Sequence, residues 1–236
     1  IFFQGSAHLS SFVTDNLNIS LNGSKIERVE SFDYLGLIID EQLKFSQHID
    51  KVRSRVLSTT FAIKRIRFYI SPHTALQLYF QHIHSILTYL LSCWSATSQS
   101  KLESLALVQK KALKIIYEKD RLYPSKQLFN AKVLPLEYLS HYQTLLLTFK
   151  LRNNLQRSNV PIRTRQEVTG RITRQSSHFY IPTALSSIGY NDFFRKGFDL
   201  YNKLPHEIRR INNLDSFKRD LKEFLFNVYF NDLDFP

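Results

Sequence analysis

The chain has 236 residues, enough for one large domain or two modest ones. Hydrophobic residues make up 43% and charged residues 22%, which is typical of a folded protein and excludes a disordered one. The 32 Lys and Arg residues against 20 Asp and Glu give a formal net charge of +12, which favours a polyanionic partner, either nucleic acid or an anionic membrane surface.

Cysteine content and hydropathy indicate the kind of compartment in which the protein is expected. Cys93 is the only cysteine, so one chain forms neither a disulfide nor a cysteine-based zinc site, and we expect a reducing compartment. The most apolar segment, residues 76–94, is interrupted by Gln, His and Ser, so we expect a soluble chain without a transmembrane helix. Residues 1–6 match the remnant of a cleavable expression tag and are set apart from the fold.

Residues 7–42 are predicted to form a small antiparallel sheet. Residues 17–21 alternate apolar and polar, Asn22-Gly23 matches a two-residue hairpin turn, and residues 25–29 alternate again. Phe32 to Ile39 is expected to be the third strand.

Residues 43–155 are predicted to form a helical bundle, because their apolar residues recur at steps of three and four. The first helix begins near Ile49 and turns inward Val52, Val56, Ile63, Ile66 and Ile70. The second begins at Pro72, with Ser71 as its cap, and is expected to reach about Ala96 at the centre of the bundle. The others are expected at residues 101–118, capped by Ser98 or Ser100, at 125–130 and at 136–154.

A second face of the first helix is basic, and its members are Lys51, Arg55, Ser58, Ala62 and Arg65. The small residues would let a phosphate backbone lie close to the helix, which makes this face a candidate site for nucleic acid. The alternative is an ordinary solvated helix face. Further candidate contacts are Arg53, Lys64 and Arg67 on the same helix and Lys110, Lys111 and Lys114 on the third helix.

Residues 156–236 are predicted to be a basic linker followed by a small helical C-terminal domain. The apolar period fades from residue 153 to 175. This segment contains only one acid, Glu167, and the arginines Arg157, Arg163, Arg165, Arg171 and Arg174. This segment is either a nucleic-acid clamp or a tether whose charge keeps it soluble. Helices are expected at residues 193–204 and 214–229, the second with Asn213 or Asp215 near its start. They pack either on the same core or as a separate unit.

Signatures of catalysis are missing from the sequence. It has neither a Gly-rich phosphate loop nor a Gly-x-Ser-x-Gly elbow. His82 and His84 are two residues apart and face different sides of a helix, and the acid pairs Asp40-Glu41 and Asp232 with Asp234 do not suggest two-metal chemistry. We therefore expect no metal and no cofactor.

Short motifs occur in a fixed order along the chain. The first are Asn22-Gly23, Phe32-x-Tyr34-Leu35-Gly36 and Asp40-x-x-Leu43-x-Phe45-x-x-His48-Ile49. Next come Leu78-Tyr79 to Cys93-Trp94, Gln109-Lys110-Lys111-Ala112-Leu113, Leu134-Pro135-Leu136 and Tyr201-Asn202-Lys203-Leu204-Pro205-His206-Glu207-Ile208-Arg209. In this order they resemble the end of the palm, the thumb and the C-terminal region of non-LTR (LINE-type) retrotransposon reverse transcriptases, especially of the Jockey and CR1 kind.

This resemblance implies a thumb that grips template RNA and the RNA–DNA hybrid, and a C-terminal region that engages template RNA or target DNA during target-primed reverse transcription. It also implies a catalytic palm elsewhere in the parent polypeptide and a location in the nucleus and cytoplasm. The cations would contact phosphates without reading sequence, while the arginines from Arg163 to Arg174 would clamp a single strand beside Tyr180 or Phe179 as stacking surface.

The sequence departs from the family pattern in three places, and these limit what the resemblance implies. The family's aromatic-x-Asp-Asp active site has no counterpart, because Asp-Asp does not occur in the sequence. We therefore expect that the chain itself is no enzyme, whereas the full-length parent would be an RNA-directed DNA polymerase. Tyr201 stands where the family usually has Trp, and would keep a buried aromatic ring with a polar group. Asp33 stands where Lys is common, which argues against a phosphate contact at that position.

Two other classes remain open. A helical protein-interaction or scaffolding module would use its aromatic residues to bind a protein and its charge for solubility. A membrane-surface domain is disfavoured, because the apolar stripes are needed inside the bundle.

Overall fold

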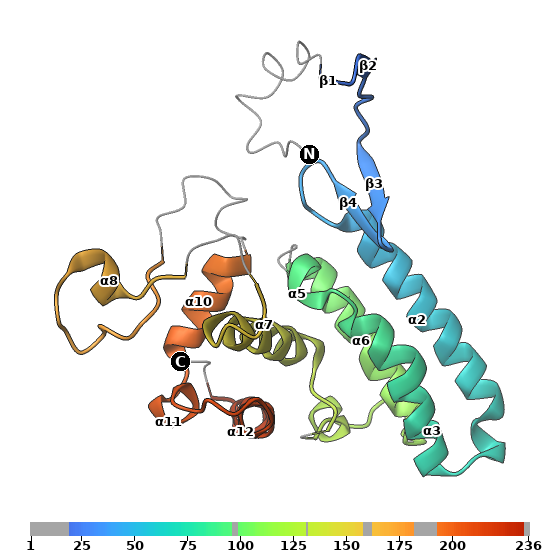
Figure 1. Ribbon diagram of the computed structural model, residues 1–236. Helices are drawn as coiled ribbons and strands as arrows, with labels where there is room; N and C mark the ends of the chain where they lie inside the picture. The colour runs from blue at the N-terminus through green and yellow to red at the C-terminus, as the bar shows by residue number, and fades with distance from the viewer. Residues whose placement is uncertain (1–18, 96–98, 131, 158–161, 182–192, 234–236) are drawn as a thin grey trace.

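The structure is a computed structural model that describes residues 19–95, 99–130, 132–157, 162–181 and 193–233. Its helices outweigh its strands, and two short antiparallel hairpins precede them, which confirms the expected fold class (Figure 1). The expected tag remnant and the start of the first strand lie outside the described residues.

The N-terminal part forms two separate hairpins. In the first, β1 (Ser20–Leu21) pairs with β2 (Ser24–Lys25), and Asn22 and Gly23 both have positive φ, as the predicted two-residue turn requires. In the second, β3 (Ser31–Tyr34) pairs with β4 (Leu37–Asp40). The prediction of one strand from Phe32 to Ile39 was wrong, because Leu35 and Gly36 also take positive φ and reverse the chain.

Helix α2 (Ser46–Ile66) follows the second hairpin and is continued by a 3-10 turn, η1 (Arg67–Tyr69). Its predicted inward residues Ile49, Val52, Val56 and Ile63 are buried. The same prediction was wrong for Ile66, which is 43% exposed because the helix ends there and the chain turns away from the core.

The second predicted helix begins as expected and then departs from the prediction. Helix α3 (Pro72–Leu78) is capped by Ser71, whose Oγ accepts a hydrogen bond from the Thr74 N–H at 3.1 Å. It continues as the π-helix η2 (Tyr79–His84), α4 (Ser85–Thr88) and α5 (Leu91–Trp94) instead of one helix.

The break between α4 and α5 is centred on Leu90. Leu90 has φ of 49°, which interrupts the helical backbone. The Trp94 Nε1–H then donates to the carbonyl oxygen of Tyr89 at 2.8 Å, and the Tyr89 hydroxyl donates to that of Leu35 at 2.5 Å. These two hydrogen bonds hold the chain in position at the break, and the second of them connects it to the second hairpin.

The remaining bundle helices are α6 (Gln99–Ile116), the 3-10 helix η3 (Ser125–Leu128) and α7 (Leu136–Arg152). Because α6 begins two residues before the expected Lys101, Ser100 lies inside it and is not its cap. The other candidate cap, Ser98, lies outside the described residues.

The C-terminal part contains α8 (Arg165–Thr169), α10 (Phe193–Lys203), α11 (His206–Arg209) and α12 (Leu214–Phe230). The prediction did not include α8 or α11. Of the two residues expected near the start of the last helix, Asn213 is its cap, since Asn213 Oδ1 accepts from the N–H groups of Asp215 and Ser216 at 3.0 Å.

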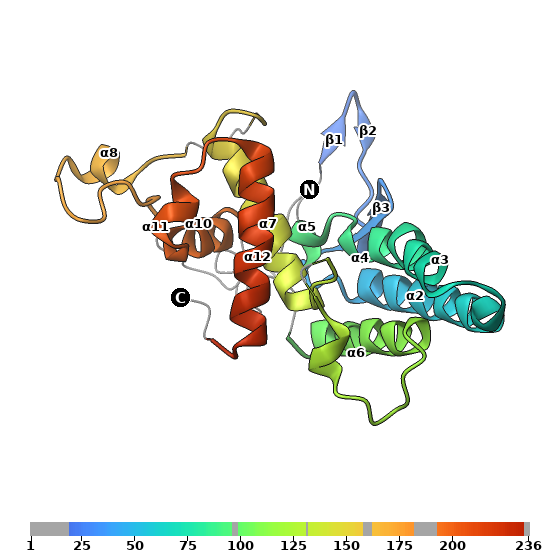
Figure 2. The same cartoon turned by 90° about the horizontal axis from the view of Figure 1, so that it is seen from below.

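Helix α7 joins the two parts of the molecule. It packs on α5 and α6 on one side and on α10 and α12 on the other, and it lies between the two groups in both views (Figures 1 and 2). One continuous hydrophobic core therefore runs from Leu37 in the second hairpin to Leu225 in α12. Tyr201 is buried and its hydroxyl accepts from Arg152 Nη1 at 2.9 Å, so it has the predicted polar contact.

Candidate nucleic-acid interface

The cations of α2 are divided between two flanks of the helix. Arg53, Arg55, Lys64 and Arg65 are exposed, as a contact to an external ligand requires. At 3.6 residues per turn, Arg53 and Lys64 lie on a different flank from Arg55 and Arg65. The predicted basic residues thus cover a wide outer face and do not form one narrow row.

Lys51 has an internal partner. Its Nζ lies 2.9 Å from Asp33 Oδ2 on β3, and both side chains are partly exposed. The hydrogen bond from Lys51 lowers the pKa of Asp33, so the aspartate stays ionised at neutral pH. Any phosphate that approached Lys51 would have to compete with this carboxylate.

Arg67 is not a surface contact, and its prediction as a nucleic-acid ligand was wrong. Only 4% of the residue is exposed. Its guanidinium donates to the carbonyl oxygens of Ile116 at 2.8 Å and Ile70 at 3.0 Å, and lies 3.4 Å from Glu118. The local period placed Arg67 among surface cations because two of its partners, Ile116 and Glu118, are distant in sequence.

Helices α2 and α6 are parallel neighbours. Lys101 Nζ near the start of α6 contacts Ser46 Oγ at the start of α2, while Arg67 just after α2 contacts Ile116 at the end of α6. Between these two contacts, the Lys111 ammonium of α6 lies 5.1 Å from the ring centroid of Phe61 on α2. The outer surfaces of the two helices are therefore continuous.

A cluster of cations surrounds an exposed aromatic ring on this shared surface. Phe61 is 52% exposed, and Lys64 and Arg65 follow it by three and four residues, which makes them its neighbours on the helix. With Lys111 from α6 they form what we call the Phe61 patch: Phe61, Lys64, Arg65 and Lys111. Of the other predicted α6 cations, Lys110 is half-buried and Lys114 donates to the Arg121 carbonyl oxygen at 2.5 Å.

The predicted arginine segment forms a loop around α8. A capping box fixes α8, since Thr164 Oγ1 accepts from the Glu167 N–H and Glu167 accepts from the Thr164 N–H. Arg163, Arg165, Arg171 and Arg174 are all exposed, and Arg165 donates to Gln175 in the same loop.

Of the two aromatic residues predicted to stack on bases beside these arginines, only Tyr180 is accessible. Tyr180 is 40% exposed, but Phe179 is only 5% exposed and packs against Phe198 and Tyr201. Phe179 as a base-stacking residue was therefore a wrong prediction, because its ring belongs to the core.

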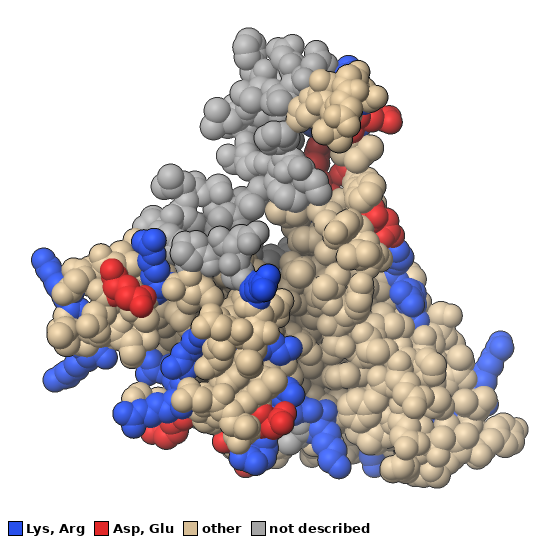
Figure 3. Space-filling view, in the orientation of Figure 1, with Lys and Arg blue, Asp and Glu red and all other residues tan. Residues whose placement is uncertain are grey.

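Figure 3 shows how the charges are distributed on one face. Lys and Arg gather over α8, α10 and α11, where some Asp and Glu lie among them, and along the outer edge of α2, whereas Asp and Glu are prominent beside the hairpins. The surface over α3 and α6 that faces the viewer is mostly uncharged. Basic side chains thus gather in two areas, one on each side of α7.

Sequence reasoning missed two signals of basic surface. The segment from Lys51 to Leu102 contains no Asp or Glu, so α2 has no acid after Asp50 to balance its cations. The loop after α6 alternates Tyr117, Lys119, Arg121 and Tyr123, a period of two that is visible in the sequence. Both Lys119 and Arg121 are exposed.

Other kinds of site find little support in the described part of the chain. No three His, Cys, Asp or Glu side chains there are close enough to hold a metal ion together. Its helices include none with the length and apolar character that a bilayer span requires.

We compared the chain with protein-family models, with curated proteins and with solved structures, and no match was found.

Proposed function

We propose that this chain holds nucleic acid as the thumb and C-terminal region of a non-LTR retrotransposon reverse transcriptase. Its ligands would be template RNA and the RNA–DNA hybrid, and target DNA during target-primed reverse transcription. The observation that carries the proposal is the Phe61 patch, where cations from two parallel helices meet around an exposed ring. Such a surface attracts phosphates and offers a ring to a sugar or base.

The charge balance of the two helices supports the same proposal. A solvated helix face usually mixes both signs, whereas α2 carries no acid after Asp50 and α6 carries only Glu103. Uncompensated cations repel one another, and a polyanion would relieve that repulsion. Phosphate contacts of this kind position a duplex without reading its sequence.

The test is fluorescence anisotropy of a labelled RNA–DNA hybrid, single-stranded RNA and duplex DNA, titrated across salt. The variant K64A/R65A/K111A removes the three cations of the Phe61 patch. We expect weaker binding of every ligand and a salt dependence that is flatter by roughly one unit for each lost contact.

The matched control K203A/K218A/R219A removes three cations that are already paired with Asp199, Asp215 and Asp220. It changes the net charge equally but should leave the salt dependence close to that of the wild type. Equal losses in both variants would show that total charge acts and not the patch.

The competing proposal is a helical protein-interaction module, and one observation favours it. Phe68 and Tyr69 are 85% and 88% exposed beside Ile66 at the end of α2. Large exposed apolar groups of this kind are frequent at protein interfaces. Salt-insensitive binding of a protein partner, together with no binding of hybrid, RNA or DNA at low salt, would favour this class.

A further inference from the structure

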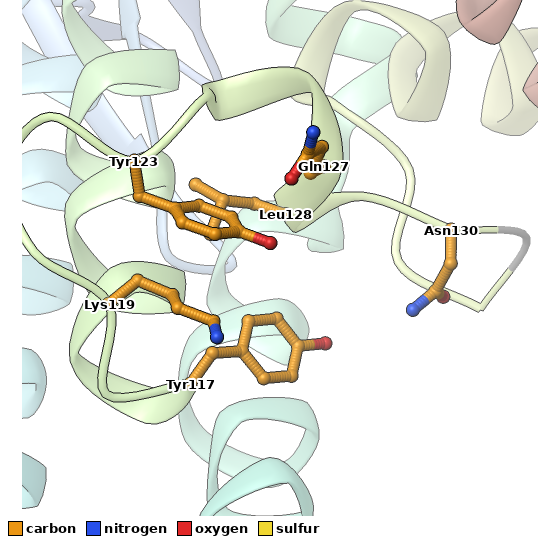
Figure 4. Close-up of a pocket in the computed structure, with 6 residues that line it drawn as sticks. All are labelled: Tyr117, Lys119, Tyr123, Gln127, Leu128 and Asn130. Atoms are coloured by element: carbon orange, nitrogen blue, oxygen red, sulfur yellow. The ribbon is translucent and has the colours of Figure 1, made fainter.

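A cavity of about 340 Å³ lies between the end of α6 and η3. Its lining residues are Tyr117, Lys119, Tyr123, Gln127, Leu128 and Asn130 (Figure 4). This volume is near the lower end of the range for ligand sites in proteins, roughly 300–1,000 Å³. The cavity therefore suits a small ligand or one unit of a larger one.

Two aromatic rings border the opening. Figure 4 shows the rings of Tyr117 and Tyr123 on opposite sides, with the Lys119 ammonium between them. That ammonium lies 4.9 Å from the centroid of the Tyr123 ring, and the fully buried Leu128 closes the cavity behind it. The Lys119 ammonium thus covers the face of the Tyr123 ring, and a flat ligand that displaces it can stack on this ring with the ammonium at its edge.

The polar edge of the cavity is rich in hydrogen-bond donors. Asn130 Oδ1 already accepts from the N–H groups of Lys132 and Val133 at 2.9 Å and 3.0 Å, which leaves its amide nitrogen to face the cavity. Burial raises the pKa of Tyr117 and a hydrogen bond with Asn130 opposes the shift, so the enclosed hydroxyl stays protonated and lies beside the Asn130 amide. Lys119 adds a charged donor.

These features exclude several ligand types. None of the six described lining residues is acidic or a histidine, so a metal ion lacks ligands. A phosphate would meet only one cation, Lys119, and would leave both rings unused. A flat heteroaromatic group with carbonyl oxygens uses both the rings and the donors.

We propose that this cavity takes one unpaired nucleobase of a single strand and prefers bases with carbonyl oxygens, uracil or guanine, to adenine. The proposal rests on the proposed function and adds a base-selective contact to it. Arg121 and Lys132 are exposed in the neighbouring loops and add positive charge that would attract the phosphates of a bound strand. Stacking alone would be tolerant of sequence, so the preference comes from Asn130, Tyr117 and Lys119.

Three variants separate stacking from hydrogen bonding. Asn130→Asp keeps the Oδ1 acceptor that holds the loop and replaces the donor nitrogen by oxygen. Tyr123→Leu removes the half-buried ring, and Tyr123→Phe is its matched control because it keeps the ring. Circular dichroism establishes that each variant is folded before binding is compared.

The measurement is the affinity for labelled oligouridine and oligoadenosine of equal length. We expect the wild type to bind oligouridine more tightly, and Asn130→Asp to abolish the ratio between the two even if its new charge weakens both. Tyr123→Leu should weaken oligouridine binding about tenfold, whereas Tyr123→Phe should stay within about twofold of the wild type.

The outcomes separate this proposal from the proposed function. If oligonucleotides bind with a steep salt dependence but the ratio is the same in wild type and Asn130→Asp, the pocket proposal fails and the proposed function stands. If no nucleic acid binds at low salt, the proposed function fails and the pocket proposal with it. Free uridine monophosphate is then added as a competitor of the labelled oligouridine. If it competes at concentrations close to those of the oligonucleotide, the natural ligand of the cavity is a free nucleotide and the proposal of a strand fails. If it competes only weakly, the ligand is a base within a strand.

Discussion

Arg67 donates a hydrogen bond from Nε to the carbonyl oxygen of Ile116 at 2.8 Å, which ties the turn after α2 to the last residue of α6. The carbonyl groups at a helix C-terminus lack helical partners and carry partial negative charge, so a buried guanidinium there is doubly favourable.

The variant Arg67→Met should therefore destabilise the fold without affecting nucleic-acid contacts. It leaves the carbonyl oxygens of Ile116 and Ile70 without their donor, and we expect a loss of about 2–4 kcal/mol in the free energy of unfolding. Urea unfolding followed by fluorescence of Trp94, the only tryptophan, measures it. The exposed neighbour provides the control, because Arg65→Ala should change stability by less than about 0.5 kcal/mol.

The pair between Lys51 and Asp33 leads to a prediction of tighter binding. Asp33→Asn removes the carboxylate that competes with phosphate for Lys51. Affinity for the RNA–DNA hybrid should rise a few-fold, and the salt dependence should steepen by roughly one unit. The double variant D33N/K51A should lose this gain. Anisotropy across salt measures both, and a gain that survives in the double variant would assign it to another cause.

The exposed arginines of the α8 loop are expected to act on single strands. In R171A/R174A, binding of single-stranded RNA should weaken more than binding of the hybrid, because the proposed duplex surface on α2 and α6 is intact. The same anisotropy assay compares the two ligands. An equal loss for both would mean that the loop and the helices hold the same ligand.

The contact between α7 and α10 depends on the absence of a side chain at Gly197. A Cβ there would lie 2.5 Å from Thr148 Oγ1, so Gly197→Ala should destabilise the fold by about 1–3 kcal/mol although alanine favours helices. Thr148→Ala removes the obstructing oxygen. The double variant should recover most of the loss, and additive losses in chemical unfolding would contradict this explanation.

Stability should fall as the pH drops from about 6.5 to about 4. Burial, helped by the charge of Lys222, lowers the pKa of His84 to about 4, and burial with Lys196 and Lys203 does the same for His141. Between the two pH values the unfolded chain binds protons that the folded chain does not, so each histidine removes up to about 3 kcal/mol from the free energy of unfolding.

The variant H84Q/H141Q tests this assignment. Its free energy of unfolding should depend less on pH between these limits than that of the wild type, since glutamine does not titrate. Urea unfolding at several pH values gives the comparison. An unchanged pH dependence would assign the acid sensitivity to the carboxylates instead.

Local signals in the sequence predicted local features correctly. Ser71 and Asn213 cap the helices they were expected to cap, and the inward residues of α2 up to Ile63 are buried. Caps and apolar periods depend only on residues within a turn or two, so they can be recognised without knowledge of the fold.

The errors concern residues whose partners are distant in sequence. Arg67 was assigned to the surface because its partner Ile116 is 49 residues away. The break at Leu90 is held by Tyr89, whose hydroxyl reaches Leu35 at a separation of 54 residues. Likewise Lys51 is paired only once the second hairpin has folded back over α2. Contacts of this kind are decided by tertiary packing, which one sequence does not reveal.

The π-helix η2 explains how a single side of the segment from Ala75 to Leu91 stays buried. Its most buried residues follow one another at steps of four: Ala75, Tyr79, Ile83, Leu87 and Leu91. In a regular α-helix each such step turns about 40° too far, so the series would wind around the helix and leave the core. The wider π-turn and the break at Leu90 turn it back. Because the wide turn accommodates one extra residue, deleting one residue within Tyr79–His84 should restore an ordinary α-helix with Leu87 still on the buried side, whereas inserting one there should rotate every later residue by about 100° and expose the series.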